Sequence, residues 1–224
     1  MRESTTTVGH SPHRIEALTD GIYAVAMTLL VIELKFPEHA EIQTATALAD
    51  ATVALIPRFI SWLISFLVLA LFWFSHHRTF DHVRHVTGQL IALNILQLAF
   101  VSLMPFCSAL VGKYGGIFLS QAVYSAVMIM LAVFSLLLSR YVYRHPECSS
   151  PPMALRLYRG SQLRNFALIA ISFVAITIGF FTVPAFGNLA YLLMAVVMPL
   201  SRRYERRAVA SALGLLGGSW GGGV

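Results

Sequence analysis

Charged side chains are scarce in this chain, and their scarcity excludes the commonest class of protein. Of the 224 residues, 12% are charged and 57% are hydrophobic, and the mean hydropathy is +0.72. A soluble domain carries about 25% charged residues, so this composition cannot supply a water-exposed surface. The sequence therefore predicts an all-α integral membrane protein that folds as one helical domain.

Cysteine and several familiar motifs are also rare or missing. Cys107 falls in an apolar segment and Cys148 in a basic loop, so no disulfide is expected between them. The chain has neither a Thr-Val-Gly-Tyr-Gly filter sequence nor a helix of regularly spaced arginines. It also lacks a Gly-x-Ser-x-Gly turn, and we do not expect an enzyme.

Neither end of the chain has the composition of a membrane span. Residues 1–13 are polar and lack the apolar stretch and cleavage site of a signal peptide, so we expect a short cytoplasmic segment there. Residues 208–224 are rich in glycine and are expected to form a flexible tail. The transmembrane domain is accordingly assigned to residues 14–207.

Apolar stretches of about 20 residues, the length that crosses a bilayer, recur between these ends. Four of them are clearly bounded, at residues 15–34, 55–75, 89–111 and 117–139. The stretch 163–200 is too long for one helix, and Pro184, Gly187 and Asn188 are expected to divide it. The sequence thus predicts six transmembrane helices and no re-entrant filter loop.

Basic residues lie almost entirely on one side of this arrangement. With the N-terminus inside, the outer side holds only Lys35, Arg58 and Lys113, and every arginine other than Arg58 lies inside. Cytoplasmic loops carry such an excess, so we predict that both ends face the cytoplasm and that the protein spans the plasma membrane. The net charge of +6 then faces anionic lipid. No basic run is interleaved with aromatic residues, so nucleic acid is not an expected partner.

A few polar side chains fall within the predicted spans, where they are costly and usually face a bundle interior or a water path. Asp20 is expected near the inner interface, at the level of His77 and Arg78. Three interpretations stay open for Asp20: a hydrogen bond that fixes the helix, a direct part in ion or proton passage, or simple exposure to interfacial water.

The histidines at the end of the second span invite a metal hypothesis. No cysteine or carboxylate pair completes a ligand set around them, so solvated or interfacial histidines are the preferred interpretation and no metal or other cofactor is expected. The histidines concerned are His76, His77, His82 and His85.

An apolar stripe runs along the first span. Val25, Leu29 and Ile32 share one helical face at about 100° per residue, with Thr28 beside them and Asp20 roughly opposite. In a membrane helix such a stripe usually marks packing or lipid contact, so its spacing alone assigns no function.

Three segments, in the same order, resemble the bacterial relatives of the endosomal/lysosomal potassium channel. Arg14-x-x-x-Leu-Thr-Asp20 is similar to the family's Arg-x-x-x-Phe-Ser-Asp motif, with Leu for Phe and Thr for Ser. Residues 72–78 resemble its Trp-x-x-His-His motif, and residues 93–106 resemble its third helix. The resemblance covers about half of the chain.

The resemblance implies a potassium channel, a homotetramer of six-helix subunits around a central pore lined by the first helix. Layers of apolar side chains narrow that pore as a hydrophobic gate, and they map to Val25, Leu29 and Ile32. A polar layer maps to Thr28. Because Val25 stands where the family often has Ile, this layer is expected to close less tightly.

The resemblance also places the motif's polar residues away from the pore, bonded to the second and third helices. The matching residues here are Arg14, Thr19, Asp20, His77 and Asn94. The implied partners are potassium ions as the permeant species, the lipid bilayer and further copies of the same chain.

Two other functions stay open. A proton-coupled transporter would move protons through Asp20 and His77. A membrane-embedded enzyme would need a polar constellation deep in the bilayer, and the sequence offers none.

Overall fold

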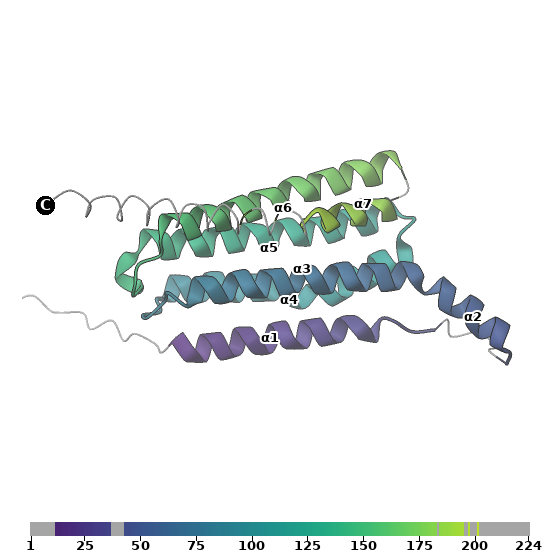
Figure 1. The fold of residues 1–224 in the computed structure, drawn as a ribbon, viewed down its shortest axis with the longest axis horizontal. Helices are drawn as coiled ribbons and strands as arrows, with labels where there is room; N and C mark the ends of the chain where they lie inside the picture. Colours follow the sequence, from purple (N-terminus) through teal and green to yellow (C-terminus); the bar gives the residue numbers. More distant parts are fainter. Residues whose placement is uncertain (1–11, 37–42, 183, 195–196, 198–200, 202–224) are drawn as a thin grey trace, which may run out of the picture.

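The computed structural model describes residues 12–36, 43–182, 184–194, 197 and 201, and this part of the chain is almost wholly helical (Figure 1). Its α-helices are α1 (Pro12–Ile32), α2 (Ala45–Ala54), α3 (Ile56–Phe80), α4 (Gly88–Tyr114), α5 (Phe118–Arg144), α6 (Leu155–Phe181) and α7 (Ala185–Leu189). Two short 3-10 segments, η1 (Pro146–Cys148) and η2 (Ala190–Leu193), complete the described secondary structure.

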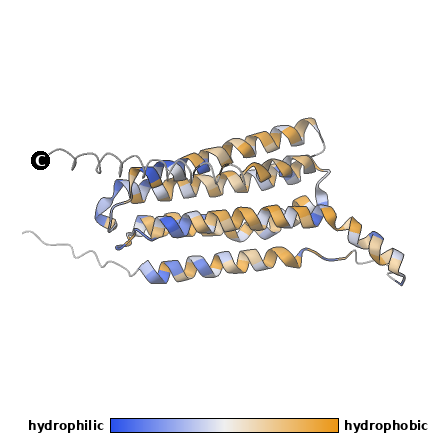
Figure 2. Cartoon of the chain, viewed as in Figure 1, coloured by the Kyte–Doolittle hydropathy of each residue, from blue (hydrophilic) through white to orange (hydrophobic). Residues whose placement is uncertain are grey.

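Five of these helices are long and apolar enough to cross a membrane, namely α1, α3, α4, α5 and α6. They run side by side in alternating directions (Figure 1), and hydrophobic residues extend along most of their length (Figure 2). Hydrophilic residues gather at the end of the bundle where α1, α4 and α6 begin. The prediction of an all-helical membrane protein is thus confirmed.

The predicted tail at 208–224 lies outside the described residues, and so does the N-terminal segment except Pro12 and His13, which begin α1. The sixth predicted span is described only in part, at residues 184–194 and 197. α6 begins earlier than predicted, at Leu155. It ends at Phe181, and helix resumes at Ala185. The predicted break therefore lies between α6 and α7, and Gly187 and Asn188 sit inside α7 instead of in the turn.

The helix α2 lies in the connection between the first two predicted spans. The hydroxyl of Thr44 accepts a hydrogen bond from the Ala47 backbone N–H at 3.1 Å and so caps the helix. None of the α2 residues is buried. The helix projects beyond the end of the bundle and does not fold back between the spans as a filter loop would (Figure 1).

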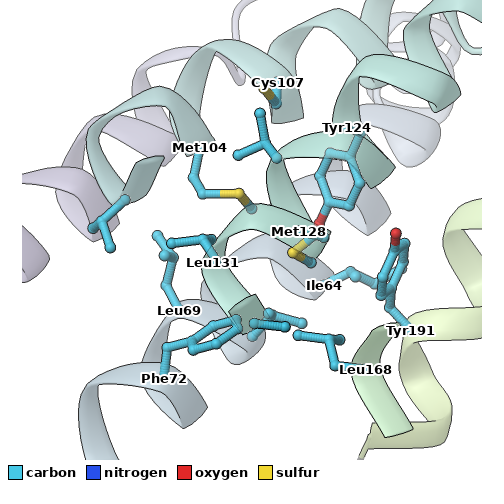
Figure 3. Close-up of a cluster of buried hydrophobic side chains, with 14 of the residues drawn as sticks. Ile64, Leu69, Phe72, Met104, Cys107, Tyr124, Met128, Leu131, Leu168 and Tyr191 are labelled. Carbon is cyan, nitrogen blue, oxygen red and sulfur yellow. The ribbon is translucent and has the colours of Figure 1, made fainter. Parts of the chain in front are cut away.

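The main hydrophobic core joins α1, α3, α4, α5, α6 and η2, and Figure 3 shows its part between α3, α4, α5, α6 and η2. Tyr124 and Tyr191 meet edge to face there, with ring centroids 5.4 Å apart. The Tyr191 hydroxyl lies within hydrogen-bond distance of two serine hydroxyls, 3.0 Å from Ser125 and 3.2 Å from Ser172. Since lipid is as apolar as a helix surface, close packing and such hydrogen bonds are what hold membrane helices together.

Gly187 marks the closest approach of α7 to α6. A Cβ added there would collide with the Ala175 carbonyl oxygen and lie 3.1 Å from Cδ of Gln121. Overpacking of this kind costs about 1–3 kcal/mol, so Gly187→Ala should lower the Tm in detergent by several degrees. Gly88→Ala is the matched control because nothing lies within 4 Å of its added Cβ. Equal Tm values for the two variants would contradict this packing.

Candidate functional site

The helix α1 lies at one edge of the bundle and packs against α3 and α4 (Figure 1). Its buried residues recur every three or four positions and therefore share one helical face. These residues are Thr19, Tyr23, Ala26 and Leu30. Ile22 and Met27, which flank this face, are partly buried, and the opposite side of α1 is not covered by the described part of this chain.

The apolar stripe lies on that uncovered surface. Val25, Leu29 and Ile32 are 56%, 41% and 49% exposed. At 100° per residue, their mean direction is about 120° away from the buried face. Thr28 is exposed beside them, and its hydroxyl donates to the Val25 carbonyl at 2.8 Å, which leaves the hydroxyl oxygen available as an acceptor.

An apolar groove with a volume of about 690 Å³ adjoins the stripe, between α1 and α4. Val25 and Leu29 line it from α1, and Ile95 and Ser102 line it from α4. An exposed apolar surface of this extent beside the stripe indicates contact with lipid or with another protein helix.

Buried hydrogen bonds fix the rotation of α1 against its neighbours. Asn94 of α4 donates from Nδ2 to the Thr19 hydroxyl at 3.0 Å, and Nε2 of His76 lies 2.8 Å from Oδ1 of Asn94. One turn further along, Nε2 of Gln97 donates to the Tyr23 hydroxyl at 3.3 Å. All five side chains are buried, where water does not compete for these bonds.

Asp20 makes a separate link to α3. Nε1 of Trp73 donates to its Oδ1 at 2.8 Å, although Asp20 itself is exposed. The ring of Trp73 stacks on His77 at 5.6 Å. His77 is exposed and lies 3.7 Å from the carboxylate of Asp81.

The polar residues assigned from the resemblance do not form one connected network in the structure. Thr19 and Asn94 are in direct contact, and Asp20 is tied to α3. The histidine beside Asn94 is His76, whereas the family resemblance implied His77. Adjacent helical residues point about 100° apart, so only one of the two can face α4. Arg14 is exposed and has no hydrogen bond or ion pair with any residue that the structure describes.

Several partners of α1 were not assigned from the sequence. Tyr23 lies four residues after Thr19, so helical spacing already put the two on one face. Trp73 and His76 both lie in the segment that resembles the family motif, but nothing in the sequence shows which side of α3 faces α1. Within the described ranges, no group of three or more His, Cys, Asp or Glu residues could hold a metal ion.

Comparison with known proteins finds sequences similar to this chain. The family model described as the endosomal/lysosomal potassium channel TMEM175 matches residues 14–105, the stretch that carries every contact of α1 given above. A potassium channel of Chamaesiphon minutus is 34% identical over 173 residues, which are 71% of this chain and 84% of that protein. The human endosomal/lysosomal proton channel TMEM175 is 38% identical over 100 residues, or 42% of this chain and 20% of that protein.

The arrangement of the helices is also similar to that of a known structure. The crystal structure of a lysosomal potassium-selective channel TMEM175 homolog from Chamaesiphon minutus matches with a TM-score of 0.68 and 26% sequence identity. The match covers 85% of this chain and 97% of that chain. Similar in sequence and in fold over most of both chains, this protein belongs to the TMEM175 family, a family of ion channels and not of enzymes.

Proposed function

We propose that this protein is a potassium channel, a homotetramer whose central pore is lined by α1 of each subunit. Val25, Leu29 and Ile32 form the constriction, and Thr28 adds a polar layer beside the middle one. The observation that carries this proposal is the orientation of α1: buried hydrogen bonds hold one face of the helix, and the apolar stripe lies exposed away from it.

Symmetry turns such a stripe into a gate. One exposed leucine has no special property, but four copies around a closed axis form a ring of apolar side chains. A narrow apolar ring excludes water and so blocks ions until it widens. The Thr28 hydroxyl oxygen provides an acceptor next to this ring, where a partly dehydrated cation needs one.

The polar residues of α1 have a supporting part in this proposal. Thr19, Asp20 and Asn94 hold α1 on α3 and α4, so that the stripe points to the axis. Arg14 and His77 belong to the same end of the bundle but are exposed in the single chain. We assign them to the periphery of this polar network, away from the proposed pore, since Trp73 stacks on His77 and Arg14 lies in the first turn of α1.

The proposed topology has six spans with both termini in the cytoplasm of a cell membrane. The arginines of the described residues support it, since all but Arg58 lie at or near the bundle end where α1, α4 and α6 begin. An excess of arginine marks the cytoplasmic side of a membrane protein.

Replacement of Leu29 tests the proposed constriction. Leu29→Ala removes most of an apolar side chain from each subunit, so the ring should widen and admit water. We expect potassium flux into liposomes to rise several-fold, or its preference over sodium to fall, with purified protein and both ions measured separately.

Leu163→Ala is the matched control, because Leu163 is similarly exposed, at 49%, on the helix α6. Flux through this control should equal that of the unmodified protein. If Leu29→Ala and Leu163→Ala behave alike, the stripe does not line the pore.

A proton-coupled transporter that uses Asp20 and His77 is the second candidate, since both are exposed titratable side chains at the same end of the bundle. Asp20→Asn removes the titratable group but keeps an oxygen that can accept from Trp73. The channel hypothesis expects the variant to remain tetrameric with near-normal potassium flux. Loss of coupled proton and potassium movement from an intact oligomer would favour the transporter instead, with a pH-sensitive dye inside the liposomes as the readout.

A further inference from the structure

Three basic residues meet in one pocket at the bundle end where α1 ends. Lys35 follows α1, Arg58 lies in the first turn of α3 and Lys113 lies in the last turn of α4. They line a pocket of about 420 Å³ between these helices. Among the lining residues that the structure describes, Glu33 is the one acidic residue. The local charge of the lining is therefore positive, at the end of the bundle that is otherwise poor in basic residues.

The backbone holds these cations close together. Nη1 of Arg58 donates to the Lys35 carbonyl at 2.9 Å and so joins the start of α3 to the end of α1. Gly112 allows α4 to approach the start of α3 closely, since a Cβ on Gly112 would lie 3.3 Å from Cα of Arg58. The ion pairs found among the described residues involve neither these three cations nor Glu33. The positive charge is thus concentrated by the fold and is not neutralised by a described carboxylate.

The remaining lining indicates the kind of anion. Leu30, Leu34 and Ala109 give the pocket apolar walls next to its basic groups. Trp62 lines the same pocket, and its buried indole N–H has no acceptor among the described residues. Tryptophan is typical of the depth at which lipid headgroups meet the acyl chains. A ligand with anionic oxygens and an attached apolar part fits this combination better than a free ion does.

We propose that this pocket binds the phosphate-bearing headgroup of an anionic phospholipid from the adjacent leaflet. Guanidinium groups bind phosphate oxygens through paired hydrogen bonds, and lysine adds point charge. Basic pockets between membrane helices are suited to such headgroups. The Arg58 and Lys113 side chains supply the contacts to phosphate, and the apolar walls contact the glycerol and upper acyl chains.

A consequence for conduction follows, and it rests on the proposed function. Glu33 and Lys35 lie one and three residues after Ile32, the last residue of the proposed constriction. Unneutralised positive charge there lowers the local concentration of cations, and a bound phosphate would raise it again. Potassium flux should therefore be higher in vesicles containing phosphatidylglycerol than in vesicles of phosphatidylcholine alone.

The test is native mass spectrometry of the full chain, delipidated and then mixed with phosphatidylglycerol or phosphatidylcholine. Arg58→Gln with Lys113→Gln should reduce bound phosphatidylglycerol by at least about fivefold. The charge-preserving pair Arg58→Lys with Lys113→Arg should retain most of it. Phosphatidylcholine should bind weakly to every variant.

A second pair of substitutions at the other end of the bundle, Arg140→Gln with Arg144→Gln, removes the same net charge from exposed positions. Equal losses for the two neutralised pairs would show attraction by net charge alone and overturn the proposal. Displacement of the lipid by excess inorganic phosphate would assign the pocket to a free anion and overturn the lipid assignment. Because binding is measured without flux, these outcomes are independent of whether the protein conducts potassium.

Discussion

The rotation of α1 about its own axis is the constraint on which the rest of the account depends. In a bilayer, an apolar helix face gains little by choosing a neighbouring helix over lipid, so apolar packing alone does not orient α1. The buried hydrogen bonds from Asn94 to Thr19 and from Gln97 to Tyr23 determine its orientation. A small rotation would leave these polar groups unsatisfied in a medium without water. Once they are in place, the helical period determines where every other α1 side chain points.

The two sides of the subunit have different parts in this arrangement. The helices α3 and α4 hold α1 with polar contacts, and they pack on their other side against α5. On the other side, α5, α6 and η2 meet α3 in a core stabilised by Tyr124 and Tyr191, which contact serine hydroxyls of α3, α5 and α6. This division allows α1 to keep one face exposed, and the proposed pore is built from that face in the assembled channel.

Hydropathy and helical spacing predicted much of this fold, and their failures have physical reasons. Four spans follow from the length of their apolar stretches. The common face of Val25, Leu29 and Ile32 follows from the helical period alone. The sequence does not show that His76, and not His77, contacts Asn94. The two histidines are adjacent, and only the rotation of α3 against α4 determines which of them faces Asn94. The helix α2 has no membrane-length apolar run to reveal it. Gly187 resembles a helix breaker in the sequence. In the structure it lies within a helix, and its missing side chain allows α7 to approach α6 closely.

Thiol modification along α1 tests the orientation of this helix most directly. Leu29→Cys and Leu30→Cys would each be made in a chain whose own cysteines are replaced (Cys107→Ser, Cys148→Ser), and potassium flux would be measured in liposomes before and after a water-soluble methanethiosulfonate reagent. Leu30 is buried against the bundle whereas Leu29 is exposed. The account predicts that modification blocks flux through Leu29→Cys and leaves Leu30→Cys unaffected. Block at Leu30→Cys with none at Leu29→Cys would contradict it, because a different face of α1 would then line the pore.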